Sequence, residues 1–264
     1  MLANKPLGVY ERNTGDLVKE LSTEDFTALA TNADGTLAAA GSTTQVNVWS
    51  IATGKRVIGI NEKRTRTGDV KFSSDNALIL VFSNEGVGRR IDLLKLATGQ
   101  IEQHAVPGIV TSHHYFCAGD GLVTWLATPA KLICWNLRDK TVRWETEHLE
   151  LRCFVTAISP DGTYLLTTDH RVSTLWDCTT GEIRYQVPCM YSIAQLAFMP
   201  DGRSFVVGGT KGQLSVWNTQ TGQRLFEIAN LKTAIEAIRP LDTGFLVATR
   251  QKKKGRPVLT WYEF

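Results

Sequence analysis

One unit of about 41 residues recurs along this chain and constrains its fold more than any other feature. Residues 200–222 read PDGRSFVVGGTKGQLSVWNTQTG: an Asp-Gly turn, an apolar run, a second turn, an alternating run that ends in tryptophan, and a Thr-Gly turn. This order of turn residues and apolar runs predicts β-hairpins. Further copies begin near residues 33, 74, 119, 160 and 241. Successive copies place an apolar or aromatic anchor 41 to 45 residues apart, at Trp49, Leu94, Trp135, Trp176, Trp217 and Trp261.

Each unit contains four short strands, which we name a to d in chain order. Strand a precedes the Asp-Gly turn, strand b follows it, strand c ends near the anchor, and strand d follows the Thr-Gly turn. A period of about 40 to 45 residues with four strands per unit predicts an all-β propeller of four-stranded antiparallel blades. A single blade has apolar side chains on both faces, so it must bury them against neighbouring blades.

The repeats resemble those of the WD40-repeat β-propeller family over almost the whole chain. The resemblance rests on the Asp-Gly turns, on the strand endings VW and LWD, and on the Thr-Gly turns. The chain resembles a divergent member, because no unit carries the family's Gly-His dipeptide and only Trp176-Asp177 spells the Trp-Asp pair. The resemblance implies a scaffold protein. The two departures predict that the family's internal Asp–His–Ser/Thr–Trp hydrogen bonds are absent.

The number of blades depends on how the first strands of the chain are used. Residues 16–21 (DLVKEL) have the pattern of a strand d, and residues 257–264 (PVLTWYEF) have that of a strand c. We favour six blades, in a ring that closes by pairing these two segments. The alternative is an incomplete seven-bladed ring, in which residues 6–10 (PLGVY) form strand c of a first blade that lacks strands a and b.

Length and composition favour one globular domain, residues 1–264, with 43% hydrophobic and 21% charged residues. The longest apolar run, ALILVF at residues 77–82, is too short to cross a bilayer, and the N-terminus lacks the apolar stretch of a signal peptide. Five cysteines with no CxxC pair predict reduced thiols in a cytoplasmic protein. We expect no contact with membranes.

Two recurring residue types look functional, but a structural role is favoured for both. Asp and Gly suit tight turns, so the turn aspartates are predicted to shape hairpins rather than to bind metal. The tryptophans of the anchor position are predicted to be structural anchors that pack between blades: Trp49, Trp135, Trp176, Trp217 and Trp261. Trp125 and Trp144 lie outside that position and are freer to bind a ligand.

The segment SHHYFC, residues 112–117, has the most reactive side chains of the chain. His113 and His114 are adjacent on a predicted strand, so their side chains point to opposite faces. No other His or Cys pair supplies further ligands at metal-binding spacing. We therefore expect no metal and no other cofactor.

Catalysis in a propeller would need polar groups that converge from the a strands. The charged residues of the predicted a strands are Asp69, Lys71 and Glu236, with the two histidines of SHHYFC near them. The sequence contains no G-x-S-x-G elbow, no phosphate-binding loop and no HExxH motif. We expect no catalytic residues, and a hydrolase or lyase centred on the channel is the third-ranked function.

Charge is distributed unevenly over the loops that join strands d to a and b to c, which share one face of a propeller, here called the top face. A basic arc gathers there from three loops: Lys63, Arg64, Arg66, Arg89, Arg90, Arg250, Lys252, Lys253, Lys254 and Arg256. An acidic arc comes from a fourth loop: Glu145, Glu147 and Glu150. Glu24 and Asp25 lie beside the basic arc and partly offset its charge.

These observations together predict a non-enzymatic scaffold that binds a protein or a peptide through its top face. An acidic partner would complement the basic arc. Binding of nucleic acid or another polyanion through the same basic loops is the second-ranked function. It ranks lower because few aromatic residues for base stacking lie among the basic ones.

Overall fold

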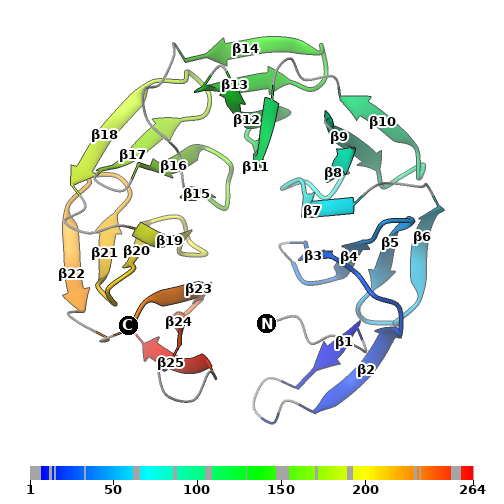
Figure 1. Cartoon of the computed structure of the whole chain (residues 1–264), viewed down its shortest axis with the longest axis horizontal. Coiled ribbons are helices and arrows are strands. Elements are labelled where there is room, and N and C mark those ends of the chain that lie inside the picture. The colour runs from blue at the N-terminus through cyan, green and yellow to red at the C-terminus, as the bar shows by residue number, and fades with distance from the viewer. Residues whose placement is uncertain are drawn as a thin grey trace. The chain divides into compact units, whose positions relative to one another are not determined.

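The computed structural model describes residues 7–11, 14, 16–32, 34–61, 66–85, 88–104, 109–128, 130–146, 155–169, 172–188, 193–228, 231, 233–250 and 257–263. These residues form strands and turns (Figure 1). The described part of the chain contains no helix of the length and apolar character that crossing a membrane requires. The chain divides into two compact units, residues 1–112 and 113–264. Each unit is described by itself, and the single domain expected above stays a prediction.

The first unit contains a two-stranded sheet and two four-stranded sheets, all antiparallel. The two-stranded sheet pairs β1 (Leu7–Tyr10) with β2 (Leu17–Ser22). The next sheet is β3 (Ala28–Thr31), β4 (Leu37–Gly41), β5 (Gln45–Ser50) and β6 (Arg56–Asn61). The third is β7 (Arg66–Phe72), β8 (Leu78–Glu85), β9 (Gly88–Lys95) and β10 (Ile101–His104).

The second unit continues the same pattern, with β11 starting a few residues before the division. The four-stranded sheets are β11 (Ile109–Cys117), β12 (Gly121–Thr128), β13 (Ala130–Asn136) and β14 (Thr141–Glu145); then β15 (Val155–Ile158), β16 (Tyr164–Thr168), β17 (Val172–Asp177) and β18 (Ile183–Pro188); then β19 (Ile193–Phe198), β20 (Ser204–Gly209), β21 (Leu214–Asn218) and β22 (Arg224–Ile228). The last described sheet has three strands, β23 (Ile235–Leu241), β24 (Gly244–Arg250) and β25 (Pro257–Glu263).

The strand β2 has a different partner from the one we expected. We predicted that residues 16–21 pair with the C-terminal strand, whereas β2 pairs with β1 in a local hairpin. A hairpin with a short connection closes at a lower entropic cost than pairing between distant segments. The ammonium group of Lys19 on β2 also donates to the carbonyl of Ile51, at 3.4 Å. The pairing of β1 with β2 is the one that the incomplete seven-bladed alternative expects, and the number of blades stays a prediction.

One register recurs in every complete repeat. The anchor of strand c always lies opposite the second residue of strand b, as in Trp176 opposite Leu165 and Trp217 opposite Phe205. The anchor Leu94 follows the same rule opposite Ile79. In several sheets the ladder between strands c and d shifts by one residue at the anchor, a β-bulge that the sequence does not announce.

The turns of the repeat are shaped by their aspartates. Asp161 Oδ1 accepts the backbone N–H of Thr163 at 3.0 Å and the Ser159 hydroxyl at 2.6 Å. The following Gly162 has φ of 71°, a backbone conformation that favours glycine. Asp201 accepts the N–H of Arg203 in the same way, at 2.9 Å. These carboxylates therefore have a structural role, because they stabilise the turns.

Core residues lie between neighbouring sheets of each unit. In the second unit, one cluster joins Leu166 and Leu175 of the sheet β15–β18 to Phe198 and Phe205 of the next sheet. The first strands of successive sheets also pack on one another, β15 on β19 and β19 on β23. Trp49, Trp135 and Trp176 are buried, whereas the side chains of Trp217 and Trp261 are half-buried.

A side chain of the fourth strand fastens each of two sheet junctions in the second unit. Trp144 Nε1 on β14 donates to the carbonyl of Cys178, in the c–d turn of the next sheet, at 2.8 Å. The hydroxyl of Tyr185 on β18 donates to the carbonyl of Thr219, in the following c–d turn, at 2.7 Å. Both rings lie against a turn glycine, where an added Cβ would come within 3.0 Å of ring atoms. The sequence pattern identified the turns but not these contacts.

Replacing a buried anchor should destabilise the protein strongly. Trp176 is buried and its Nε1 donates to Thr167 Oγ1 at 2.8 Å. We expect Trp176→Ala to lower the free energy of unfolding by about 3 to 5 kcal/mol, since it leaves a cavity and an unpaired hydroxyl. Urea unfolding followed by tryptophan fluorescence measures this change. Val18→Ala, at an exposed position, is the control and should change stability by less than about 0.5 kcal/mol. Equal midpoints for the two variants would contradict a structural role for Trp176.

The junction at Tyr185 should weaken at alkaline pH. Burial raises the pKa of Tyr185 to about 12, above the value of about 10 expected in an unfolded chain. The folded state therefore holds the proton more tightly, and its stability should fall as pH rises from about 10 to about 12. Tyr185→Phe should show a shallower loss over this range, measured by chemical unfolding at each pH. An identical pH profile for the two proteins would contradict the assignment.

Candidate functional site

Most of the basic arc lies outside the described residues. This applies to Lys63, Arg64, Lys252, Lys253, Lys254 and Arg256, and to the side chains of Arg66, Arg89 and Arg250. The exception is Arg90, whose Nε lies 2.6 Å from the carboxylate of the fully buried Asp92. This pair holds the guanidinium against the sheet β7–β10. A partner-binding role for the arc stays a prediction.

Of the three residues of the acidic arc, the structure describes Glu145. Glu145 is exposed at the end of β14, and its carboxylate lies 2.7 Å from Lys131 Nζ on β13. Glu147 and Glu150 lie outside the described residues. An exposed pair of this kind adds little stability, so Glu145 remains available to a ligand at small cost.

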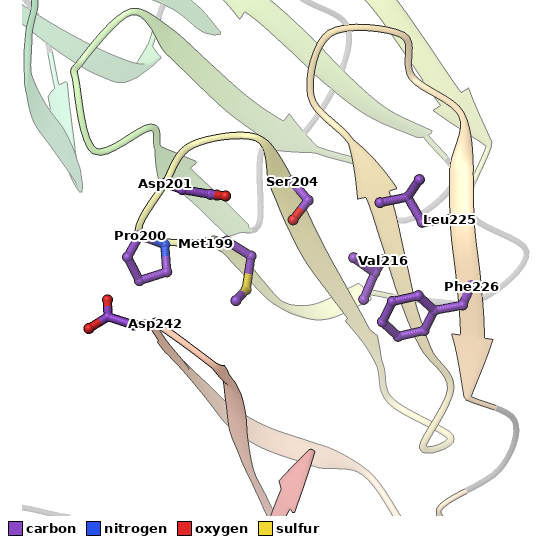
Figure 2. Close-up of a pocket in the computed structure, with 8 residues that line it drawn as sticks. All are labelled: Met199, Pro200, Asp201, Ser204, Val216, Leu225, Phe226 and Asp242. Atoms are coloured by element: carbon purple, nitrogen blue, oxygen red, sulfur yellow. The ribbon is translucent and has the colours of Figure 1, made fainter. Parts of the chain in front are cut away.

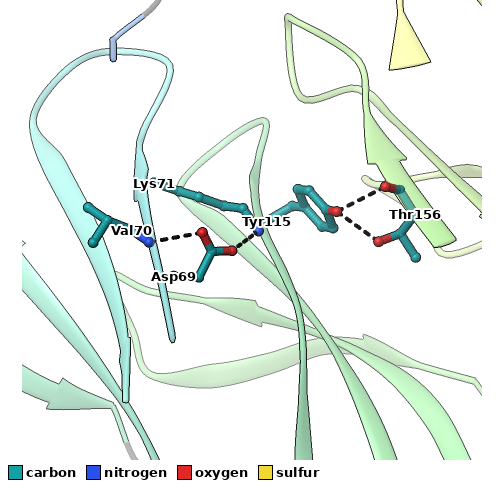
Figure 3. A network of polar contacts seen from close by, with 5 residues as sticks. All are labelled: Asp69, Val70, Lys71, Tyr115 and Thr156. Atoms are coloured by element: carbon teal, nitrogen blue, oxygen red, sulfur yellow. Dashed lines mark hydrogen bonds and ion pairs between the residues drawn. The ribbon is translucent and has the colours of Figure 1, made fainter. Parts of the chain in front are cut away.

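The charged residues of the predicted a strands fall in both units and are described for each unit by itself. In the first unit, Asp69 accepts the N–H of Val70 at 2.9 Å and pairs with Lys71 Nζ at 2.7 Å (Figure 3). In the second unit, Glu236 is exposed on β23. Asp69 and Lys71 thus form a charge pair on β7, and the absence of catalytic residues stays a prediction.

The segment SHHYFC contributes a hydrogen-bonded tyrosine and a buried thiol. The Tyr115 hydroxyl donates to the carbonyl of Thr156 at 3.0 Å and accepts from the Thr156 hydroxyl at 2.8 Å (Figure 3). The side chains of His113, His114 and Trp125 lie outside the described ones. Among the residues whose positions are described, no group of three or more His, Cys, Asp or Glu side chains could hold a metal ion.

Three free, buried thiols gather where the sheets β11–β14 and β15–β18 meet. Cys117 Sγ lies 3.6 Å from Cys134 Sγ, and Cys134 Sγ lies 3.9 Å from the carbonyl of Cys178. The hydrogen bond between the thiols lowers the pKa of Cys117 and raises that of Cys134, which burial raises further. Gly121 makes room for this contact, because a Cβ there would lie 2.2 Å from Cys117 Sγ. The spacing of the cysteines in the sequence did not predict that these three meet.

The described surface has a pocket of about 430 Å³ between the sheets β19–β22 and β23–β25 (Figure 2). Its lining is mostly apolar, with carboxylates from the a–b turns of both sheets: Met199, Pro200, Asp201, Ser204, Val216, Leu225, Phe226 and Asp242. Met199 and Val216 are buried, whereas Leu225 and Phe226 on β22 are large exposed apolar residues. Exposed apolar side chains that line a pocket are typical of binding sites.

The two carboxylates of the pocket come from the recurring Asp-Gly-type turns. Asp201 and Asp242 line one pocket, and in the first unit Asn76 Nδ2 lies 3.4 Å from Asp34 Oδ2 of the neighbouring turn. Turns of adjacent sheets within a unit therefore lie close together. That the turn aspartates bind no metal stays a prediction.

Solved structures that resemble this chain are β-propellers. No protein-family model matches the sequence. The β-propeller domain of Cps50 (Swd1) from Myceliophteria thermophila is similar over 98% of this chain and 90% of that chain, at 14% identity and a TM-score of 0.73. The computationally designed Ika8 protein is similar over 97% of this chain and 77% of that chain, at 17% identity and a TM-score of 0.72. The chain therefore folds as a β-propeller of four-stranded antiparallel blades, which confirms the predicted fold class.

The contact between Cys117 and Gly121 can be tested by a double-mutant cycle. Gly121→Ala should lower the free energy of unfolding by about 1 to 3 kcal/mol, because its methyl group overlaps Cys117 Sγ. Adding Cys117→Ala should recover a large part of that loss, since it empties the space that the methyl group needs. Chemical unfolding of the wild type, both single variants and the double variant gives the coupling. Additive losses would show that the thiol does not occupy that space.

Proposed function

We propose that this chain is a non-enzymatic propeller that binds another protein or a peptide. The observation that carries the proposal is the pocket beside β22, which exposes large apolar side chains at the junction of two sheets. Its walls are β-strands and tight turns, so a ligand would meet a preformed surface. The protein would therefore lose little conformational entropy on binding. Binding residues on rigid scaffolds concentrate in turns and loops of this kind.

A second binding surface is proposed on the top face. The loops that contain residues 61–68, 84–90 and 250–257 bring ten of the chain's 29 Lys and Arg residues together in the sequence-based arrangement. The sequence predicts that three lysines and an arginine lie in the last b–c loop, where their mutual repulsion would be relieved by an acidic partner. The proposal also places the chain in the cytoplasm, where the free thiols of Cys117, Cys134 and Cys178 would stay reduced.

Charge reversal in the last b–c loop tests the top-face proposal. Substituting Lys252, Lys253, Lys254 and Arg256 by Glu should weaken capture of an acidic partner from native lysate, mainly through slower association that added salt reproduces. Partners are identified by mass spectrometry, and their affinity for the purified wild type and variant is then titrated at low and at physiological salt. The matched control reverses four exposed cations elsewhere: Lys55, Arg138, Arg184 and Arg203.

The two outcomes of this titration separate the alternatives. Equal affinity and equal salt dependence for both variants would remove the top face from the proposed function. Equal competition by DNA or RNA at physiological salt would favour the nucleic-acid alternative instead.

A further inference from the structure

The three buried thiols where the sheets β11–β14 and β15–β18 meet differ in their access to water. Cys117 is 6% exposed, whereas Cys134 and Cys178 are fully buried. Cys117 is therefore the member of this thiol cluster that a small solute reaches most directly. Cys134 Sγ lies 3.6 Å from Cys117 Sγ, so the two sulfur atoms are in contact.

A cation lies beside Cys117. Arg143 on β14 donates from Nη1 to the carbonyl of Ala118 at 2.9 Å and from Nη2 to the carbonyl of Gly119, which holds the guanidinium against this a–b turn. A Cβ on Gly121 would lie 2.2 Å from Cys117 Sγ and 3.1 Å from Arg143 Nη1, so the thiol and the guanidinium border the same small space. Hydrogen bonds from the two other thiols and, to a smaller extent, this positive charge lower the pKa of Cys117.

These features are the ones that thiol oxidation requires. The thiolate, rather than the thiol, attacks an oxidant, and cysteines that sense oxidants are typically accessible and lie next to a second cysteine. Cys117 has the partly exposed position and the neighbouring cation. The contact of 3.6 Å selects Cys134 as the second cysteine, and Cys178 is the alternative.

We propose that Cys117 and Cys134 are a redox modification site, which a hydroperoxide converts into a reversible disulfide. With hydrogen peroxide, the sulfur of Cys117 first attacks one oxygen: an S–O bond forms, the O–O bond breaks, and the other oxygen leaves as water with the thiol proton. The sulfur of Cys134 then attacks this sulfenic acid: the S–S bond forms, the S–O bond breaks, and a second water leaves with the Cys134 proton. The two thiols lose two electrons and the peroxide gains them. The inference goes beyond the proposed function, because it concerns the state of the scaffold rather than its ligand.

Formation of this disulfide changes the contact between the two sheets. Cys134 Sγ lies 3.9 Å from the carbonyl of Cys178, which also accepts the indole N–H of Trp144. An S–S bond is about 2.05 Å long, so the sulfur of Cys134 must move toward that of Cys117. Since the oxidised sulfur of Cys134 carries no proton, it no longer donates to the Cys178 carbonyl. Oxidation of the thiol pair is thereby linked to the junction at which Trp144 binds the next turn.

Treatment of the full chain with hydrogen peroxide tests the site. In a background with Cys153→Ala and Cys189→Ala, only the three thiols of the cluster remain. The reduced protein is exposed to peroxide, its free thiols are blocked with N-ethylmaleimide, and cross-linked peptides are identified by mass spectrometry. We expect one disulfide, between Cys117 and Cys134, that dithiothreitol removes. Cys178→Ala should form the same disulfide, because its thiol takes no part in the two steps.

Single substitutions separate the roles of the residues. Cys134→Ala should leave a sulfenic acid on Cys117, which dimedone labels, and Cys117→Ala should abolish both products. Arg143→Gln should slow oxidation at least about tenfold at neutral pH and move the pH midpoint of Cys117 alkylation upward, because the thiolate fraction falls. Arg138→Gln, at an exposed arginine in the c–d turn of the same sheet, is the matched control and should react like the wild type.

Three outcomes would overturn the inference, and none of them depends on a variant that must fold. The first is that the folded background protein forms no disulfide, although the same protein forms one in urea. The second is a disulfide between Cys117 and Cys178 in the background protein. The third is an equal rate of Cys117 oxidation in the folded and the unfolded chain, which would show that the fold does not activate this thiol.

Discussion

The structure depends on sheets that must bury both of their faces. The middle strands show this most clearly: four successive residues of β17 are buried, and so are the last four of β4. A strand at the surface of a single sheet alternates between buried and exposed positions, so continuous burial requires a neighbour on each side. The apolar anchor, its recurring register and the tight Asp-Gly turns all serve to keep successive sheets in position for that packing.

Burial of this kind also explains which polar groups the middle strands tolerate. Asp92 on β9 is fully buried, and Arg90 two residues earlier supplies the opposite charge. Removing Arg90 would take an opposite charge away from a carboxylate that is shielded from water, which costs far more than the pair contributes. The arginine that the sequence placed in a binding arc thus has a structural task, and only the neighbouring buried carboxylate reveals it.

The sequence predicted the parts of the fold that repeat, and it failed where the structure depends on contacts between units of the repeat. Spacing alone gave the strands, the turns and the fold class, because each of these is encoded within about 41 residues. It did not predict the hydrogen bonds of Trp144 and Tyr185 to the next turn. Two different residue types make this contact, so no recurring residue marks it in the sequence. It also assigned β2 a distant strand, although β1 lies only a short connection away.

The candidate pocket escaped the sequence for a related reason. A repeat pattern predicts what each unit contains, whereas this pocket is lined by residues of two successive sheets. The residues around it are ordinary members of the repeat: two turn aspartates, a strand valine and two side chains of a fourth strand. At the two preceding junctions of this unit, Trp144 and Tyr185 donate hydrogen bonds to the turn of the next sheet. The proposed function gives the pocket to a ligand, and rigid walls would let most of the contact energy appear as affinity.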